Sequence, residues 1–236
     1  MSINEQTAVV VGVGPGLGMA LVDALAAAGY VVFAAARNID RVAGLSAGQR
    51  AGRVVPLACD ATIPAEVEGL FERAAQRAPL AIAIYNAGTF ERGTVLETDP
   101  LDFKRSWRIG CFGGFLVGRA AARLMLPHAA GTILFTGATA SLRGGAGFVN
   151  LASPKFALRA VAQSMARELG PKGIHVAHVI IDGQIHSERY ADLLGTRGPD
   201  SLLEPAAIAN AYLTLHRQPR TAWTHELDLR PWVEKF

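Results

Sequence analysis

The sequence predicts a single α/β domain of the Rossmann type, with a doubly wound parallel sheet. Short apolar runs, each about the length of a buried strand, alternate along the chain with longer segments of helical periodicity. This alternation forces parallel strand pairing through right-handed crossovers. A length of 236 residues, 50% of them hydrophobic, suits one domain with a large core. We therefore expect residues 1–236 to form one unit.

The expected elements follow from these patterns and from the turn residues between them. Strands buried on both faces are expected at residues 7–11, 31–35, 54–57, 80–85, 132–135 and 174–181. Helices are expected at residues 17–28, 64–77, 99–126 and 153–169. Gly29 follows the first helix, Pro64 opens the second and Gly170 follows the last, as boundary residues do. Residues 223–236 are expected to supply a last strand and an aromatic tail.

Composition excludes several classes of protein. The net charge is only +3, from 23 basic and 20 acidic residues, and without a Lys/Arg run we expect no nucleic-acid surface. The first residues lack a signal-peptide pattern, and no uninterrupted apolar stretch is long enough to cross a bilayer. Cys59 and Cys111 lie in apolar segments, as buried, reduced thiols do. We expect a cytoplasmic protein with neither a metal site nor a membrane partner.

A glycine-rich segment, GVGPGLG at residues 12–18, follows the first expected strand and opens the first expected helix. In that context Gly12 permits the tight turn, Gly16 lets backbone N–H groups approach a diphosphate, and Gly18 lets the helix pack closely on the strand. An ordinary glycine-rich turn is the alternative. The segment predicts a nucleotide-binding loop made by Gly12, Gly14, Gly16, Leu17 and Gly18.

The end of the second expected strand indicates which nucleotide binds. The chain reads AAARN at residues 34–38, with no carboxylate to accept hydrogen bonds from an adenosine ribose 2′-OH. Arg37 offers instead a planar cation suited to a 2′-phosphate. A solvated arginine at a strand end is the alternative. We therefore expect NADP(H) rather than NAD(H).

The glycine loop, the segment YNAG at residues 85–88 and Lys155 make the chain similar to the short-chain dehydrogenase/reductase family over almost its whole length. The resemblance implies that Asp60 contacts the adenine, that residues 86–88 lie along the adenosine ribose, and that Lys155 binds the nicotinamide ribose. The turn after the sixth strand would contact the carboxamide. Beyond the loop, the implied cofactor residues are Arg37, Asp60, Asn86, Ala87, Gly88, Lys155, Gly183, Ile185 and Ser187. Turn chemistry and a solvated helix lysine are the alternatives.

Three catalytic positions depart from the family's pattern. The family places a tyrosine four residues before the lysine, a serine after the fifth strand and an asparagine in the helix expected at residues 99–126. This chain has Leu151, Ala138 and Gly110 at those positions. Lys155 is retained, and with no tyrosine pKa to lower it keeps only its ribose role. The chain is thus identified as a divergent member that has the cofactor half of the site without the acid–base half.

Some neighbouring side chains are candidates to replace the tyrosine. Asp182 and His186, on the turn after the sixth strand, are the candidate proton donors, with a turn aspartate and an exposed loop histidine as the alternative. Strand alternation points Thr139 away from the face of Ala138 and leaves Thr136 one step deeper in the sheet. The other neighbours lack a phenol: Phe148, Asn150 and Ser153.

Three functions remain open. The first is NADP(H)-dependent reduction of a small carbonyl, imine or quinone with a non-standard proton donor, because a positioned acid contributes only about 10²–10⁴-fold of an enzyme's acceleration. The second is an NADP(H)-binding sensor or partner subunit without turnover. The third is a non-redox lyase like the halohydrin dehalogenases, which give up the glycine loop and keep a tyrosine, the reverse of this chain.

Assembly and closure over a small-molecule substrate are also expected. In the family, the helices that correspond to residues 99–126 and 153–169 pair across a two-fold axis, so the resemblance implies a homodimer or homotetramer. Packing of these helices on the sheet alone is the alternative. Residues 183–203 suit a mobile lid over the substrate.

Overall fold

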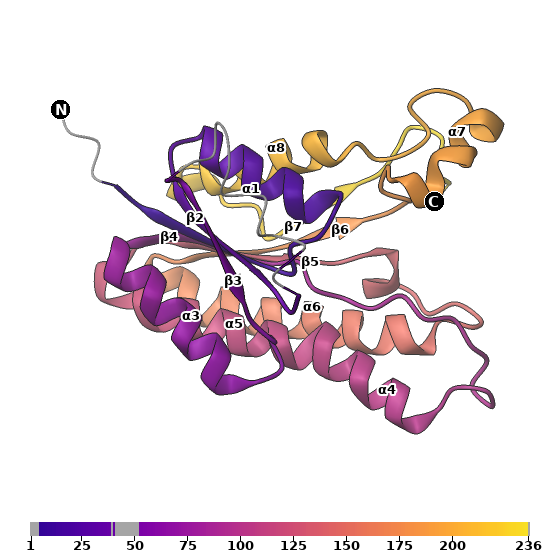
Figure 1. Cartoon of the computed structure of the whole chain (residues 1–236), viewed down its shortest axis with the longest axis horizontal. Coiled ribbons are helices and arrows are strands. Elements are labelled where there is room, and N and C mark those ends of the chain that lie inside the picture. The colour runs from indigo at the N-terminus through magenta and orange to yellow at the C-terminus, as the bar shows by residue number, and fades with distance from the viewer. Residues whose placement is uncertain (1–4, 39, 41–51, 236) are drawn as a thin grey trace.

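The computed structural model describes residues 5–38, 40 and 52–235. They form a seven-stranded sheet in the order β3-β2-β1-β4-β5-β6-β7, and every neighbouring pair is parallel (Figure 1). The strands are β1 (Thr7–Val11), β2 (Val31–Ala36), β3 (Val54–Ala58), β4 (Leu80–Tyr85), β5 (Thr132–Thr136), β6 (His175–Ile181) and β7 (Glu226–Leu229). The strand order reverses beside β1, which confirms the predicted doubly wound sheet.

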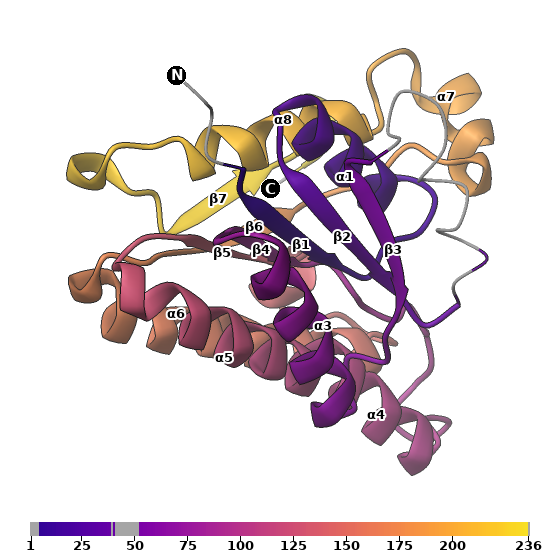
Figure 2. The same ribbon diagram turned by 60° about the vertical axis from the view of Figure 1, so that its left-hand side comes forward.

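Helices cover both faces of the sheet (Figures 1 and 2). One face carries α1 (Leu17–Ala27) and α8 (Pro205–His216), and the other carries α3 (Pro64–Arg77), α5 (Gly113–Met125) and α6 (Val149–Leu169). Alternate strand residues therefore enter two separate cores. Val9 packs in the core under α3, α5 and α6, whereas Val10 packs in the core under α1 and α8.

The helix expected at residues 99–126 is not uniform. It consists of α4 (Pro100–Trp107), a π-helical turn (Arg108–Phe112) and α5. Within the run Pro100–His128, one 18-residue window has a mean hydropathy of 1.4, so by length and composition alone this helix could cross a membrane. Of that apolar window, 67% is buried inside the protein. Packing of α5 against β4 and α6 accounts for its apolar surface.

Three other elements differ from the sequence expectation. Helix α6 begins at Val149 instead of residue 153, so Leu151 lies in its first turn. Strand β3 is an edge strand and is partly exposed, because the sheet ends there, so it is not buried on both faces. Helices α7 (Ala191–Arg197) and α8 were not predicted, although Pro205 is a normal first helical residue.

Candidate functional site

The carboxyl ends of β1, β2 and β4 border a cavity of about 470 Å³, at the point where the strand order reverses. This is where open α/β sheets bind their ligands. Seven of the residues expected to bind the cofactor line the cavity: Gly12, Gly14, Arg37, Asp60, Asn86, Ala87 and Gly88. Asn38, Thr62 and Ile109 also line it and were not predicted; of these, only Asn38 had a sequence signal, its position beside Arg37.

The glycine loop has the geometry that a diphosphate requires. Gly12 has a φ of +92°, and a Cβ there would overlap the backbone of Ala87. A Cβ on Gly18 would lie 2.8 Å from the Cα of Val13, so α1 packs tightly on the loop. Gly14 and Gly16 face open space, which leaves the backbone at the start of α1 accessible. The residues present therefore fit a phosphate group held at a helix N-terminus.

Leu17 has a different structural role from the glycines of the same loop. It is the first residue of α1, and its side chain is buried in the core under α1 and α8. Only its backbone N–H lies at the helix N-terminus, where it could meet an anion.

The second strand ends in Ala36 and is followed by the exposed Arg37 and Asn38. No carboxylate follows β2 directly in the described part of the chain. Asp60 lies across the cavity, where its Oδ1 accepts a hydrogen bond from Thr62 N at 2.8 Å. The arginine is thus free to meet an anion at this edge of the cavity.

Asn86 joins three segments behind the cavity. Its Nδ2 donates to Gly12 O at 3.1 Å, and its Oδ1 accepts from Thr136 Oγ1 at 3.0 Å. The Thr136 hydroxyl also lies 2.8 Å from Tyr212 Oη on α8, the helix layer opposite α6. The Thr136 hydroxyl is therefore already hydrogen-bonded, on the face of the sheet away from Lys155.

Lys155 lies on α6 and is only 6% exposed. Its Nζ donates to Thr136 O at 2.7 Å, and a Cβ on Gly88 would lie 3.6 Å from the same Nζ. Burial lowers the pKa of Lys155 to about 8, because water no longer solvates the ammonium. One hydrogen bond leaves further N–H donors available beside the cavity, where ribose hydroxyls could accept them.

The three residues expected at the catalytic positions, Leu151, Ala138 and Gly110, carry no acidic group. Leu151 is one turn before Lys155 on α6 and is partly buried. Ala138 follows β5, and its N–H donates to Ser141 Oγ at 3.1 Å. Gly110 lies in the π-helical turn, where an added Cβ would meet Pro154 Cβ at 2.6 Å. The glycine and the proline are therefore complementary in shape.

The turn after β6 is tied to two other segments. Asp182, only 5% exposed, accepts a hydrogen bond from Thr139 Oγ1, and its Oδ2 lies 3.4 Å from Arg230 Nη2. Thr139 begins a 3₁₀ turn rather than extending β5, so strand alternation does not fix its direction. His186 Nδ1 lies 2.7 Å from Glu204 Oε1 in a partly exposed pair. Asp182 thus lies beside a cation, and His186 lies beside a carboxylate.

The remaining expected carboxamide contacts lie on the same turn. Gly183 has a φ of +139°, and a Cβ on it would lie 2.9 Å from Pro231 Cδ, so the C-terminal segment covers it. Ile185 forms a backbone bridge to Leu203. Ser187 is partly exposed just before a 3₁₀ turn. None of these three lines the 470 Å³ cavity.

His178 on β6 is buried directly behind Gly137 and is 0% exposed. Its Nδ1 lies 3.8 Å from Glu226 Oε1, and Glu226 is paired with Arg159 Nε at 2.6 Å. Burial, together with the nearby Lys155 charge, lowers the pKa of His178 to about 4. The imidazole is therefore neutral in the folded protein at neutral pH.

This histidine makes the fold acid-sensitive. The unfolded chain protonates it near pH 6.5, whereas the folded protein resists protonation down to about pH 4. The neutral, buried imidazole therefore adds its full share to the free energy of unfolding above pH 6.5. That share, up to about 3 kcal/mol, is lost as the pH falls toward 4. His178→Gln should flatten the fall in unfolding free energy between pH 7 and 5, measured by urea denaturation. His128→Gln, at an exposed histidine, is the control; an unchanged slope in His178→Gln would contradict the assignment.

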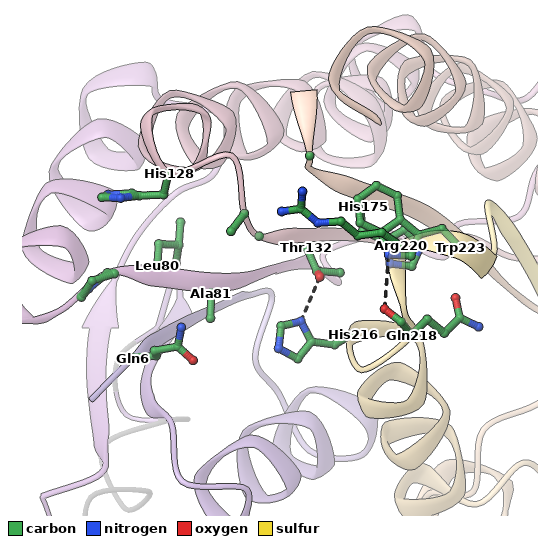
Figure 3. A pocket seen from close by; sticks show the side chains of 14 residues that line it. Gln6, Leu80, Ala81, His128, Thr132, His175, His216, Gln218, Arg220 and Trp223 are labelled. Carbon is green, nitrogen blue, oxygen red and sulfur yellow. Dashed lines mark hydrogen bonds between the residues drawn. The ribbon is translucent and has the colours of Figure 1, made fainter. Parts of the chain in front are cut away.

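A second cavity, of about 280 Å³, lies at the amino ends of the strands, away from the glycine loop (Figure 3). Two of the histidines that line it, His216 and His175, are engaged in hydrogen bonds. His216 Nδ1 lies 2.9 Å from Thr132 Oγ1 and its Nε2 lies 2.9 Å from Tyr30 Oη. His175 Nε2 lies 2.8 Å from Thr224 O, and the ring stacks on Trp223 at 4.9 Å. These contacts hold the helix ends to the sheet.

Comparisons with known proteins agree with this geometry. Residues 6–192 match the family model for short chain dehydrogenases. The crystal structure of a short-chain dehydrogenase from Rhodopseudomonas palustris is 45% identical, with a TM-score of 0.85, over 96% of this chain and 99% of that one. The 3-oxoacyl-[acyl-carrier-protein] reductase of Bos taurus is 27% identical over 190 residues, 80% of this chain and 79% of its own. Carbonyl reductase family member 4 of Danio rerio is 27% identical over 226 residues, 91% and 92% of the two chains.

Proposed function

The chain belongs to the short-chain dehydrogenase family, and we propose that it is an NADP(H)-dependent oxidoreductase that reduces a small carbonyl, imine or quinone. The observation that carries the proposal is the 470 Å³ cavity, which brings the open glycine loop and Arg37 to one edge of the sheet. Lys155 lies beside it, next to Gly88. The names of two relatives, a carbonyl reductase and a 3-oxoacyl reductase, support a carbonyl substrate.

We propose that Arg37 reads the 2′-phosphate of NADP(H). The exposed guanidinium has no carboxylate beside it at the described end of β2. Asp60 and residues 86–88 would receive the adenosine half, and Lys155 would donate to the nicotinamide ribose. Gly183, Ile185 and Ser187 would meet the carboxamide, with residues 183–203, including α7, as a lid.

We also propose that the protein lacks the family's positioned acid. Leu151, Ala138 and Gly110 stand where the family has tyrosine, serine and asparagine. A restored asparagine would collide with Pro154, which indicates that the chain has adapted to the glycine. When bound, the nicotinamide supplies the hydride; the chain's own residues orient the cofactor and surround the acceptor with apolar groups.

The replacement donors considered from the sequence, Asp182 and His186, are held by other side chains and do not line the 470 Å³ cavity. Asp182 pairs with the Arg230 cation and accepts a hydrogen bond from the Thr139 hydroxyl. His186 is held by Glu204 at the surface. We therefore propose that water supplies the proton. Asp182→Asn and His186→Gln are the first variants to test, because these two side chains are the alternative donors.

The test is titration with NADPH and NADH, followed by turnover with a panel of ketones, imines and quinones. The proposal expects tight NADPH binding and measurable quinone reduction. No binding of either nucleotide would refute it. Tight binding without turnover on any acceptor would instead support the second candidate, a silent NADP(H)-binding sensor or partner subunit, which the apolar Leu151 and Ala138 favour.

Assembly through α4–α5 and α6 forms part of the proposal. Phe115 and Phe156 are each 42% exposed on these helices, and burying them requires a partner surface. Gel filtration with light scattering should give the mass of a dimer or tetramer. Phe115→Glu with Phe156→Glu should lower that mass, because two carboxylates would be buried; a monomeric wild-type protein would contradict the proposal.

A further inference from the structure

The first turns of α6 continue the candidate site beyond Lys155. Phe148 precedes the helix, and its carbonyl accepts hydrogen bonds from Leu151 N at 3.0 Å and Ala152 N at 2.8 Å. Positions three and seven residues apart share one side of a helix. Phe148, Leu151 and Lys155 therefore follow one another along the same face of α6.

The segment after β4 runs along that face and touches it at both ends. At one end Gly88 lies beside Lys155, where an added Cβ would be 3.6 Å from Nζ. At the other end Gly93 N donates to Gly147 O at 3.1 Å, and the rings of Phe90 and Phe148 meet edge to face at 6.1 Å. Leu151 lies between these two contacts. The aromatic pair is thus one turn beyond Leu151, on the side away from the ribose-binding lysine.

Large apolar surfaces stay open to solvent at this place. Phe90 is 48% exposed, and Leu142, on the loop that leads to Phe148, is 39% exposed. Exposed apolar side chains that lie close to a binding site favour a ligand that covers them. An edge-to-face ring pair offers a further flat ring the same favourable geometry. These features favour an aromatic ligand.

The charge beside the aromatic pair is positive. The Arg92 guanidinium lies 4.7 Å from the centre of the Phe148 ring. Arg92 and Arg143, the latter on the loop before Phe148, have no ion-pair partner among the described residues. The adjacent carboxylate, Glu91, is already paired with Arg105 at 2.6 Å. Unpaired arginines attract an anion and repel a cationic iminium.

We propose that this surface, made by Phe90, Arg92, Leu142, Phe148 and Leu151, binds an aromatic acceptor that carries an anionic group, such as a quinone sulfonate or carboxylate. The inference rests on the proposed oxidoreductase function and narrows its substrate class. Imines that react as cationic iminium ions are thereby excluded as acceptors, because the arginines would repel them.

The chemistry of such an acceptor suits a site without an acid. The quinone accepts a hydride, which carries two electrons, from a reduced nicotinamide, and its two C=O groups become C–O bonds of an aromatic ring. The product takes one proton from water and leaves as the hydroquinone, while the cofactor leaves oxidised. The anion formed is a phenolate, a much weaker base than the alkoxide formed from a ketone, so it needs no positioned acid.

The test compares ligands that differ in one charge. Naphthalene-2-sulfonate and naphthalene-2-carboxamide are titrated calorimetrically into the protein, with and without saturating NADP⁺. We expect the sulfonate to bind about 10-fold more tightly, as a charge-assisted contact to arginine contributes. Arg92→Gln should remove most of that preference. Arg123→Gln, a surface arginine paired with Glu68, is the matched control and should keep it.

The turnover arm uses 1,2-naphthoquinone-4-sulfonate and 1,2-naphthoquinone with NADPH. We expect a similar preference in kcat/KM, abolished by Arg92→Gln. Equal affinities of the two naphthalenes, or a preference that survives Arg92→Gln, would overturn the inference. Failure of NADPH to bind would instead refute the proposed function, whereas NADPH binding with equal reduction of both quinones would refute only the anionic acceptor.

Discussion

Leu151→Tyr combined with Ala138→Ser is expected to raise ketone reduction by about 10²–10⁴-fold, the contribution of a positioned acid. Leu151 lies one turn before Lys155 on α6, so a phenol there would have the buried ammonium beside it. That cation would lower the phenol's pKa and make it a better acid. The measurement is kcat/KM for a neutral ketone with NADPH in excess.

Quinone reduction is the internal control for this variant. It should change much less, because its product needs no strong acid. Gly110→Asn should not add to the gain by itself, since its Cβ would overlap Pro154, and Pro154→Ala would be needed with it. Suppose instead that the wild-type protein reduces ketones rapidly, with no gain in the double variant. That result would mean that another group already supplies the proton.

Arg37→Ala is expected to weaken NADPH binding by about 10- to 100-fold, because charge-assisted hydrogen bonds contribute about 1.5–3 kcal/mol. NADH lacks the 2′-phosphate, so its affinity should stay nearly the same. The affinities can be measured by titration of nicotinamide fluorescence. Arg77→Ala, at a surface arginine paired with Glu5, is the control. Equal losses for both nucleotides would refute the role of Arg37.

The nucleotide half of the site was predictable because its parts are local in sequence. A glycine loop between a strand and a helix has one geometry that works, and Gly12, Gly14 and Arg37 do line one cavity. The parallel sheet followed from the alternation of strand and helix patterns. These features depend on spacing and backbone sterics, which a sequence displays directly.

The acceptor half depends on contacts between distant segments, and the sequence does not display them. No pattern connects Asp182 with Arg230, or Gly110 with Pro154, since each pair meets only through packing. The early start of α6 brings Phe148 and Leu151 onto the face of Lys155. The position of Arg92 over Phe148 likewise depends on the segment after β4 folding back on α6.

We propose that hydride transfer from NADPH in this protein takes place without a positioned protein acid. The most direct measurement is kcat/KM of the NADPH-saturated wild-type protein for a neutral ketone and for a quinone of similar size. We expect quinone reduction to be measurable and ketone reduction to be at least about 10²-fold slower. Ketone reduction as fast as quinone reduction, lost in Asp182→Asn or His186→Gln, would contradict it.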